Sequence, residues 1–496
     1  MAIGIGTMIA GGVGVAAAAG VGISMVRAAT TYKAKPAKDA GEYPVENADV
    51  ERYINNLSKA IQIPTISNFD DDLVDWSKFD EFHAFLEEAY PLIHSKLEKT
   101  IISKKSLVFH WKSAHPEKEP ICMLAHQDVV PVSKGTEDDW TYPAFSGTVA
   151  DGFVWGRGAL DIKNHLIGVM EAVETLLEEG YVPERDVYLC FGHNEEVMAE
   201  GRHSGAYCIM EYFKEKGIKL DSVIDEGGAI LPVNVKGVIN KKLAGVGVAE
   251  KGHVDFEIST FAKGGHSSQP PKHTALGRLA KIICKLEKNQ FKEEITPMMS
   301  ALFTEIGKNT TYPVRCVMCN VPVLKPLIRK IMIQIPPAAC MTRTTTAVTM
   351  ASGSPAPNVL PQKATINVNL RIMPGQTIET VEAHLKKCAG KDAEVKLVKG
   401  NNPSKISPTD SRAFKTISKI CKSMDADNII APYLVMGGTD SRQYEPVCDN
   451  IYRYSPFPVS TELLLTTHGT NERIPVTALG DGVVFFKRYI KELTKD

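Results

Sequence analysis

The stretch HLIGVMEAVETLLEEGYVPERDVYLCFGHNEEV, residues 165–197, joins a helical pattern to a short apolar run that ends in two glutamates. Similar apolar runs, ICMLAH at 121–126 and SVID at 222–225, also end in polar residues. Short apolar strands that alternate with longer helices predict an α/β fold with a mostly parallel central sheet.

The polar residues at the ends of these three runs are expected to meet. They are His126 with Asp128, Glu195 with Glu196, and Asp225. Ligands of open α/β sheets bind at the carboxyl ends of the strands. Acids and histidines that are far apart in the sequence are thus expected along one edge of the sheet.

A second domain interrupts the first. We expect residues 45–246 and 405–496 to form one catalytic domain, and residues 247–400 to be inserted into it. The insert alternates HVDFEISTFA and ATINVNLRIM with two amphipathic helices, and this order predicts a β-α-β-β-α-β unit on an antiparallel sheet. Such a unit is an α+β, ferredoxin-like lid or dimerisation domain. The pattern at 296–350 predicts no particular structure.

The N-terminal segment, residues 1–30, is apolar, and its first charged residue is Arg27. A helix of this length can cross a bilayer, so a membrane anchor is the leading interpretation. A cleaved signal peptide, and therefore secretion, is the second, and a flexible leader the third. The net charge of the chain is −1, which gives no electrostatic reason to expect nucleic-acid binding.

The polar residues at the strand ends have the chemistry of metal ligands. Zinc binds imidazole nitrogen and carboxylate oxygen, and a carboxylate between two close zinc ions offsets their repulsion. Asp161 in GRGALDIK and His468 in HGTNE add to the candidates. Each of these short motifs alone is weak evidence, because an isolated pair of polar residues is more often solvated or a helix cap.

The ordered set of motifs is far more specific than any one of them. It resembles the co-catalytic zinc peptidase family of aminoacylase, glutamate carboxypeptidase and carboxypeptidase S, and within it the branch of carboxypeptidase S and the N-acyl-amino-acid hydrolases. The motifs, from residue 125 onward, are AHQDVVPV, WxxPAFSG, GRGALDIK, GHNEEV, DEGG, KGGHSSQPP, NVLPQKATINVNLRIMPG, MGGTDSR and HGTNE.

The resemblance implies a site for two Zn²⁺ ions, with Co²⁺ or Mn²⁺ as possible substitutes. It implies that His126 and Asp225 bind one ion, that Glu196 and His468 bind the other, and that Asp161 bridges both. Glu195 corresponds to the general base of the family. Asp128, two residues after His126, is expected to orient that imidazole rather than to bind metal.

Three residues of the inserted domain match positions that bind substrate in the family. His266 corresponds to a histidine that stabilises the reaction's oxyanion, often across a homodimer interface. Asn358 and Arg371 correspond to substrate-binding residues, and Arg371 can pair with a carboxylate. The sequence departs from the family at Asn164 and Asn194, where a small and an acidic residue are usual.

The predicted activity is hydrolysis of an amide or peptide bond next to a free carboxylate, by a metallocarboxypeptidase or an N-acyl-amino-acid amidohydrolase. The substrate is then a small peptide or an N-acyl amino acid. A deacylase or dipeptidase of the same family with another amide substrate is an open alternative. A non-catalytic binding module tethered to a membrane is the alternative from a different class.

Overall fold

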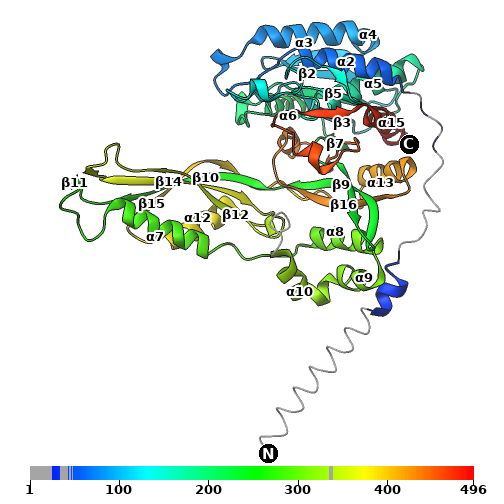
Figure 1. Cartoon of the computed structure of the whole chain (residues 1–496). Helices are drawn as coiled ribbons and strands as arrows, with labels where there is room; N and C mark the ends of the chain where they lie inside the picture. The colour runs from blue at the N-terminus through cyan, green and yellow to red at the C-terminus, as the bar shows by residue number, and fades with distance from the viewer. Residues whose placement is uncertain (1–24, 34–42, 44–45, 47, 334–338, 496) are drawn as a thin grey trace, which may run out of the picture.

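The larger part of the molecule is built on one mixed sheet of nine strands (Figure 1). In this computed structural model, residues 25–33, 43, 46, 48–333 and 339–495 are described. The middle strands of the nine-stranded sheet, β6, β3, β7 and β17, run parallel to one another, and antiparallel strands flank them. In spatial order the strands are β1 (Glu98–Ile102), β2 (Ser106–Trp111), β6 (Val187–Gly192), β3 (Ile121–His126), β7 (Ser222–Asp225), β17 (Ile451–Arg453), β9 (Ile239–Glu250) and β16 (Asn428–Val435), with β8 (Ile230–Val235) paired to β9.

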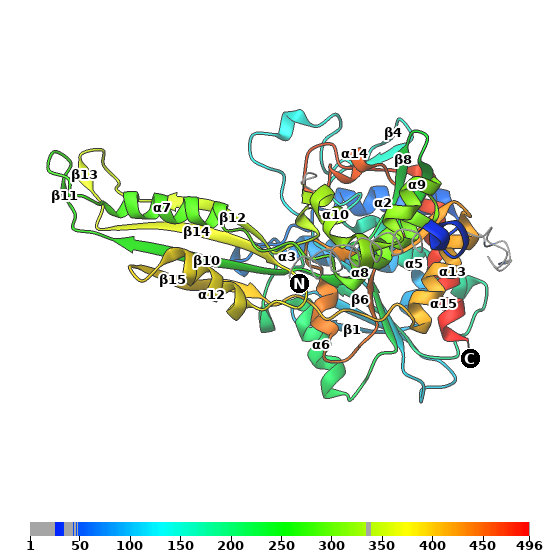
Figure 2. The ribbon, with the colours of Figure 1, turned by 90° about the horizontal axis from the view of Figure 1, so that it is seen from below.

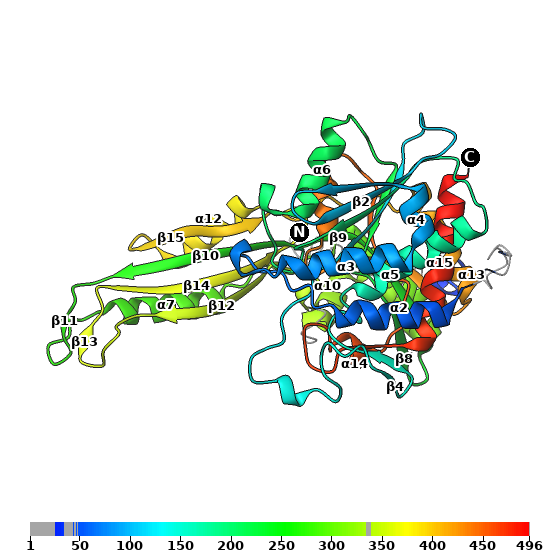
Figure 3. The same cartoon turned by 90° about the horizontal axis from the view of Figure 1, so that it is seen from above.

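Helices cover both faces of this sheet (Figure 3), which confirms the predicted α/β class. One face is covered by α2 (Val50–Gln62), α3 (Trp76–Ala89), α4 (Pro91–Lys96), α5 (Lys163–Glu178), α13 (Arg412–Met424) and α15 (Val476–Thr494). The other face packs against α6 (Gly205–Glu215) and residues 444–448. Strands buried on both faces explain why ICMLAH and VYLCFG are continuously apolar.

The inserted unit is the long arm of the molecule (Figure 2). Its antiparallel sheet has the order β12-β14-β10-β15, and α7 and α12 pack on one face through their own apolar core, as the predicted ferredoxin-like order requires. Its elements are β10 (Gly252–Phe261), α7 (Ala275–Lys288), β12 (Thr345–Ser352), β14 (Lys363–Ile372), α12 (Ile378–Ala389) and β15 (Ala393–Asn401). A short pair at the far end joins β11 (Gly265–His266) to β13 (Val359–Leu360).

Three helices fill the region for which the sequence predicted nothing. They are α8 (Pro297–Lys308), α9 (Tyr312–Met318) and α10 (Val321–Ile333). Thr296 caps α8 by accepting a hydrogen bond from the Met299 amide, and Pro297 takes the first helical position. The helix α8 packs against β16, so these helices extend the larger part of the molecule.

The predicted membrane anchor at 1–30 lies mostly outside the described residues. Residues 25–30 are helical. Within the described part of the chain, no helix has both the length and the apolarity needed to span a bilayer.

Candidate metal centre

Four polar segments from different parts of the chain meet at the carboxyl ends of the parallel strands. His126 is the last residue of β3, and Glu195 and Glu196 follow β6. Asp161 lies in the loop before α5, and His468 follows α14 (Thr461–Leu464). A small sheet of β4 (Val149–Ala150), β5 (Phe153–Trp155) and β18 (Arg473–Pro475) brings the last two loops together.

Asp161 lies between two histidines. Its Oδ1 is 3.2 Å from Nε2 of His126, and its Oδ2 is 3.0 Å from Nε2 of His468. Nε2 of His468 is also 3.0 Å from Oε2 of Glu196. His468 has a left-handed backbone, φ +59°, which is uncommon for a residue with a side chain and often marks a functional position. The carboxylate of Asp161 therefore has the geometry of a bridge.

Glu226, rather than Asp225, completes the cluster. Oε1 of Glu226 is 3.2 Å from Nε2 of His126. The carboxylate of Asp225 instead accepts hydrogen bonds from the amides of Glu226 and Ser441, both at 2.9 Å. The structure thus does not bring Asp225 into the group predicted from the sequence. Two adjacent acids at a strand end could not be told apart by sequence alone, although the DEGG motif contains both.

Potential ligand atoms form two overlapping groups. Those of His126, Glu195 and Glu226 lie within 4.8 Å of one another, and so do those of His126, Asp161 and Glu196. Oε2 of Glu195 is 3.9 Å from Nε2 of His126. The predicted base and four of the five predicted ligands are therefore neighbours.

Asp128 fixes the segments around these residues. The carbonyl oxygen of Asp128 is 2.9 Å from Nδ1 of His126, and its Oδ1 is 3.4 Å from the same nitrogen. Its carboxylate also accepts hydrogen bonds from the amides of Glu195 and Glu196 at 3.1 Å and from the Ser67 hydroxyl at 2.5 Å. Asp128 therefore orients both His126 and the turn that carries the two glutamates.

Glu472 is a buried acid that the sequence reasoning missed. Its Oε1 accepts hydrogen bonds from the amides of Gly158, Leu160 and Asp161 at 2.8–3.1 Å. Its Oε2 is 2.5 Å from the guanidinium of Arg157. Glu472 thus ties the loop of Asp161 to the loop of His468. The HGTNE motif contained it, but nothing in the sequence indicated an internal partner.

The cluster is strongly acidic, and its electrostatics favour a positive charge at its centre. Burial alone would lower the pKa of His126, but hydrogen bonds to Asp128, Asp161 and Glu226 raise it well above its ordinary value. Hydrogen bonds to Asp161 and Glu196 raise the pKa of His468 to about 10. Burial, and then the charge of Asp161, raises the pKa of Glu226 to about 8.

The donor set fits divalent metal ions. Imidazole nitrogens and carboxylate oxygens are ligands that zinc prefers. Oε1 of Glu196 is buried and has no hydrogen-bond partner among the described residues, so it is a ligand atom available to a cation. Metal binding requires both imidazoles in their neutral form, so a bound cation would replace the protons that the raised pKa values of His126 and His468 favour.

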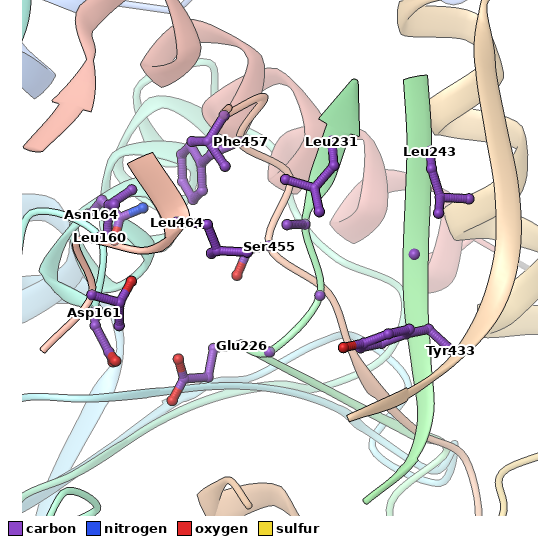
Figure 4. Close-up of a pocket in the computed structure, with 16 residues that line it drawn as sticks. Leu160, Asp161, Asn164, Glu226, Leu231, Leu243, Tyr433, Ser455, Phe457 and Leu464 are labelled. Atoms are coloured by element: carbon purple, nitrogen blue, oxygen red, sulfur yellow. The ribbon is translucent and has the colours of Figure 1, made fainter. Parts of the chain in front are cut away.

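A pocket of about 290 Å³ opens beside the cluster (Figure 4). Asp161 and Glu226 stand at one end of it, and the rest of the wall is mostly apolar. The side chains that form this wall include Leu231, Leu243, Tyr433, Phe457, Val459 and Leu464. No Lys or Arg is among the described residues that line it. Apolar groups of a ligand can therefore bind next to the cluster.

The three predicted substrate-binding residues lie on the arm. His266 is exposed on β11 at its far end, where its Nδ1 is 2.8 Å from the Ser268 hydroxyl. The carbonyl of Asn358 accepts a hydrogen bond from the Ser267 amide. Arg371 lies on β14 opposite His253, at the end of the strand nearer the sheet of the larger part (Figure 1). The structure does not gather them around the acidic cluster, and their roles, like the homodimer, stay predictions.

Sequence comparison places these features in a known family. The model of the peptidase family M20/M25/M40 matches residues 122–492. A probable carboxypeptidase S-like 2 of Dictyostelium discoideum is 33% identical over 454 residues, covering 90% of this chain and 86% of that protein. The N-fatty-acyl-amino acid synthase/hydrolase PM20D1 of Mus musculus is 30% identical over 485 residues, covering 94% and 93%. These are the two kinds of relative that the motifs indicated.

Solved structures share the fold. The M20 family metallo-carboxypeptidase Sso-CP2 of Sulfolobus solfataricus superposes with a TM-score of 0.64 at 19% identity, over 89% of this chain and 99% of that one. Human carnosine dipeptidase 1 superposes with a TM-score of 0.60 at 13% identity, over 90% and 96%. The chain therefore belongs to the peptidase family M20/M25/M40 and is a metal-dependent hydrolase of the metallocarboxypeptidase and amidohydrolase type.

Proposed function

We propose that this chain binds two zinc ions and hydrolyses the amide bond of N-acyl amino acids or of short peptides, next to a free carboxylate. In this proposal His126 and Glu226 hold one ion, Glu196 and His468 hold the other, and Asp161 binds both. The observation that carries the proposal is the contact of the two Asp161 oxygens with two histidines that lie 342 residues apart in the sequence (468 − 126). A carboxylate shared in this way is what a two-metal site needs.

When bound, zinc supplies a Lewis acid and a water of lowered pKa. The carboxylate of Glu195 lies 3.9 Å from His126 and makes no contact with Asp161, so it would be free to accept a proton from the attacking water and to donate one to the leaving amine. Burial raises the pKa of Glu195 well above its ordinary value, as suits a group that holds and then releases a proton. Asp128 keeps the imidazole of His126 and the turn of Glu195 in place.

The pocket indicates which part of the substrate lies next to the cluster. A substrate carboxylate needs a cationic partner, and the described residues of the pocket wall include neither Lys nor Arg. The apolar wall suits the acyl side of the amide instead. The names of two relatives, an N-fatty-acyl-amino acid synthase/hydrolase and a carboxypeptidase S, agree with an acyl or peptidyl group at this place.

Arg371 is the residue we assign to the substrate carboxylate. Burial lowers the pKa of its guanidinium. The family resemblance matches this arginine to a substrate-binding position, where it could pair with a carboxylate. Arg371 belongs to the arm, and the acidic cluster belongs to the larger part. A substrate whose carboxylate binds Arg371 and whose amide lies at the cluster would therefore contact both parts of the molecule.

A substrate panel tests this proposal. The full chain, supplied with zinc, is given N-acyl amino acids with short and long acyl groups and blocked dipeptides, each paired with its C-terminal amide. We expect turnover of the carboxylates, preference for apolar acyl groups, and about two zinc ions per chain by metal analysis. Equal cleavage of carboxylates and amides would contradict the role of Arg371, and a chain that binds no zinc would contradict the whole proposal.

A further inference from the structure

The outer side of α10 combines apolar and basic side chains that are all exposed. At about 100° per residue these positions share one side of the helix, while Val321, Leu324 and Ile328 pack inward against α8 and its neighbours. Val323 is 51% exposed and Leu327 48%. The residues of this side, which we call the basic apolar face, are Pro322, Val323, Lys325, Pro326, Leu327, Arg329 and Lys330.

The stretch of sequence that contains this face carries charge of a single sign. Between Glu305 and Glu379 the sequence contains no acidic residue. Lys325, Arg329 and Lys330 form no ion pair with any described residue, whereas Lys78 on α3 and Lys308 on α8 each pair with a glutamate one turn away. Unpaired cations beside exposed apolar groups are the pattern of a helix that lies on an anionic bilayer.

The N-terminal part of the chain arrives at the same end of the molecule. The Tyr312 hydroxyl on α9 donates a hydrogen bond to the carbonyl of Met25, and the Arg315 guanidinium donates one to the carbonyl of Ala28. Figure 1 shows the helix at 25–30 beside α9, and Figure 2 shows α9 and α10 on the face that is turned toward the viewer. Met25 and Val26 are exposed there.

The sequence of that N-terminal part matches the face of α10. Residues 2–24 carry no charge, and the first acidic residue of the chain is Asp39. Arg27 and Lys33 add two cations next to α9. Residues 25–33, which contain no acid, thus lie against α9, next to a helix whose exposed side also lacks acids.

We propose that the basic apolar face of α10, together with residues 25–33, docks on the surface of an anionic lipid bilayer. The apolar side chains Val323 and Leu327 would enter the interfacial region, and Lys325, Arg329 and Lys330 would contact lipid phosphates or carboxylates. Charge complementarity selects a lipid surface with acidic headgroups. This inference does not depend on the proposed hydrolysis.

Vesicle binding by the full chain tests whether the basic side chains of α10 attract it to acidic lipids. The chain is mixed with vesicles of phosphatidylcholine alone or of phosphatidylcholine with phosphatidylserine, and the bound fraction is measured by sedimentation at low and high salt. We expect preference for the acidic vesicles, and a loss of roughly a hundredfold in partition for Lys325→Glu/Arg329→Glu/Lys330→Glu. The matched control, Lys281→Glu/Lys285→Glu/Lys288→Glu, changes charge equally on the exposed side of α7 and should bind like the parent.

A reporter at the face separates docking by α10 from attachment by any other segment. Leu327→Trp should be quenched by brominated phospholipids in the vesicles, while Leu276→Trp on α7, 45% exposed in the parent, should not. The proposal would be overturned if the α10 charge variant bound acidic vesicles as well as the parent does. It would also be overturned if the tryptophan at position 327 were not quenched when the chain is bound to brominated vesicles. So would binding to acidic proteins but not to acidic vesicles. Thermal unfolding of each variant checks that the surface changes leave the fold intact.

Discussion

The guanidinium of Arg157 and the carboxylate of Glu472 lie 2.5 Å apart and are both buried, 315 residues apart in the sequence (472 − 157). Arg157 also donates a hydrogen bond to the carbonyl of Gly469, next to His468. This one pair therefore holds the loops of Asp161 and His468 against each other.

Glu472→Gln should weaken metal binding without unfolding the chain. The neutral amide that replaces the carboxylate would face the Arg157 guanidinium, and the loops of Asp161 and His468 would lose their common anchor. Loss of a group that orients ligands typically costs about 10–100-fold in metal affinity. Competition with a chromophoric chelator measures this affinity.

Glu171→Gln is the matched control for that variant. This change also neutralises a buried acid that pairs with an arginine, because Glu171 lies 2.7 Å from Arg52. Glu171, however, is on α5 and is not part of the metal centre. If both variants change metal affinity equally, Glu472 has no positioning role.

Glu195→Gln should keep the metal and lose activity. A missing general base lowers turnover by about 10²–10⁴-fold. Turnover and metal content are measured on the same sample, with Glu200→Gln, an exposed acid nearby in the sequence, as the control. Near-normal turnover of Glu195→Gln would remove Glu195 from its assigned role.

Glu226→Gln and Asp225→Asn should have different effects. Because the Glu226 carboxylate lies 3.2 Å from His126, its neutralisation should reduce the metal content. Asp225→Asn should retain both ions but lower the free energy of unfolding by about 1–3 kcal/mol, since two buried amides lose a charged acceptor. Metal analysis and urea unfolding compare the two variants. The reverse pattern would restore Asp225 as the ligand.

Gly245→Val should shorten the acyl groups that the pocket accepts. A Cβ at this position would be no closer than 3.6 Å to Tyr433, so the new side chain fits the backbone but fills part of the pocket. At ~0.8 kcal/mol per buried methylene, the ratio of kcat/KM for octanoyl over acetyl substrates should fall about tenfold or more. Gly245→Ala is the smaller step, and an unchanged ratio in both variants would place the acyl group elsewhere.

Lys251 should make stability rise with pH. Its Nζ donates hydrogen bonds to the carbonyls of Cys340 and Arg343, and burial lowers its pKa to about 8. Between about 8 and the unfolded value of about 10.4, the unfolded chain binds more protons at this site, so its contribution to stability grows with pH, by at most ~1.4 kcal/mol per unit. Below about pH 8 the lysine is protonated in both states, and this pH dependence is absent.

Comparison with Lys251→Met isolates this effect from the other groups that titrate at alkaline pH. The free energy of unfolding in urea is measured for both proteins from about pH 7 to about pH 10, the range that spans the folded and unfolded pKa values. The difference between them should shift in favour of the parent as pH rises. A difference that stays constant over this range would show that Lys251 has an ordinary pKa.

The architecture could be predicted because its signals are local. Apolar strands followed by polar residues gave the sheet and its edge, and strand and helix periods gave the arm. The helices α8–α10 could not be predicted, since prolines at 297, 313, 322 and 326 mark both helix starts and breaks. The choice between Asp225 and Glu226, and the partnership of Glu472, depend on contacts across the fold that no local pattern encodes.

The strand β17 lies between β7 and β9, although its residues, 451–453, come after both of those strands in the sequence. A chain still attached to the ribosome before that point has a gap in the middle of its sheet, and it also lacks His468. The complete sheet, and with it the proposed hydrolytic site, can therefore form only after residues 451–468 have been synthesised.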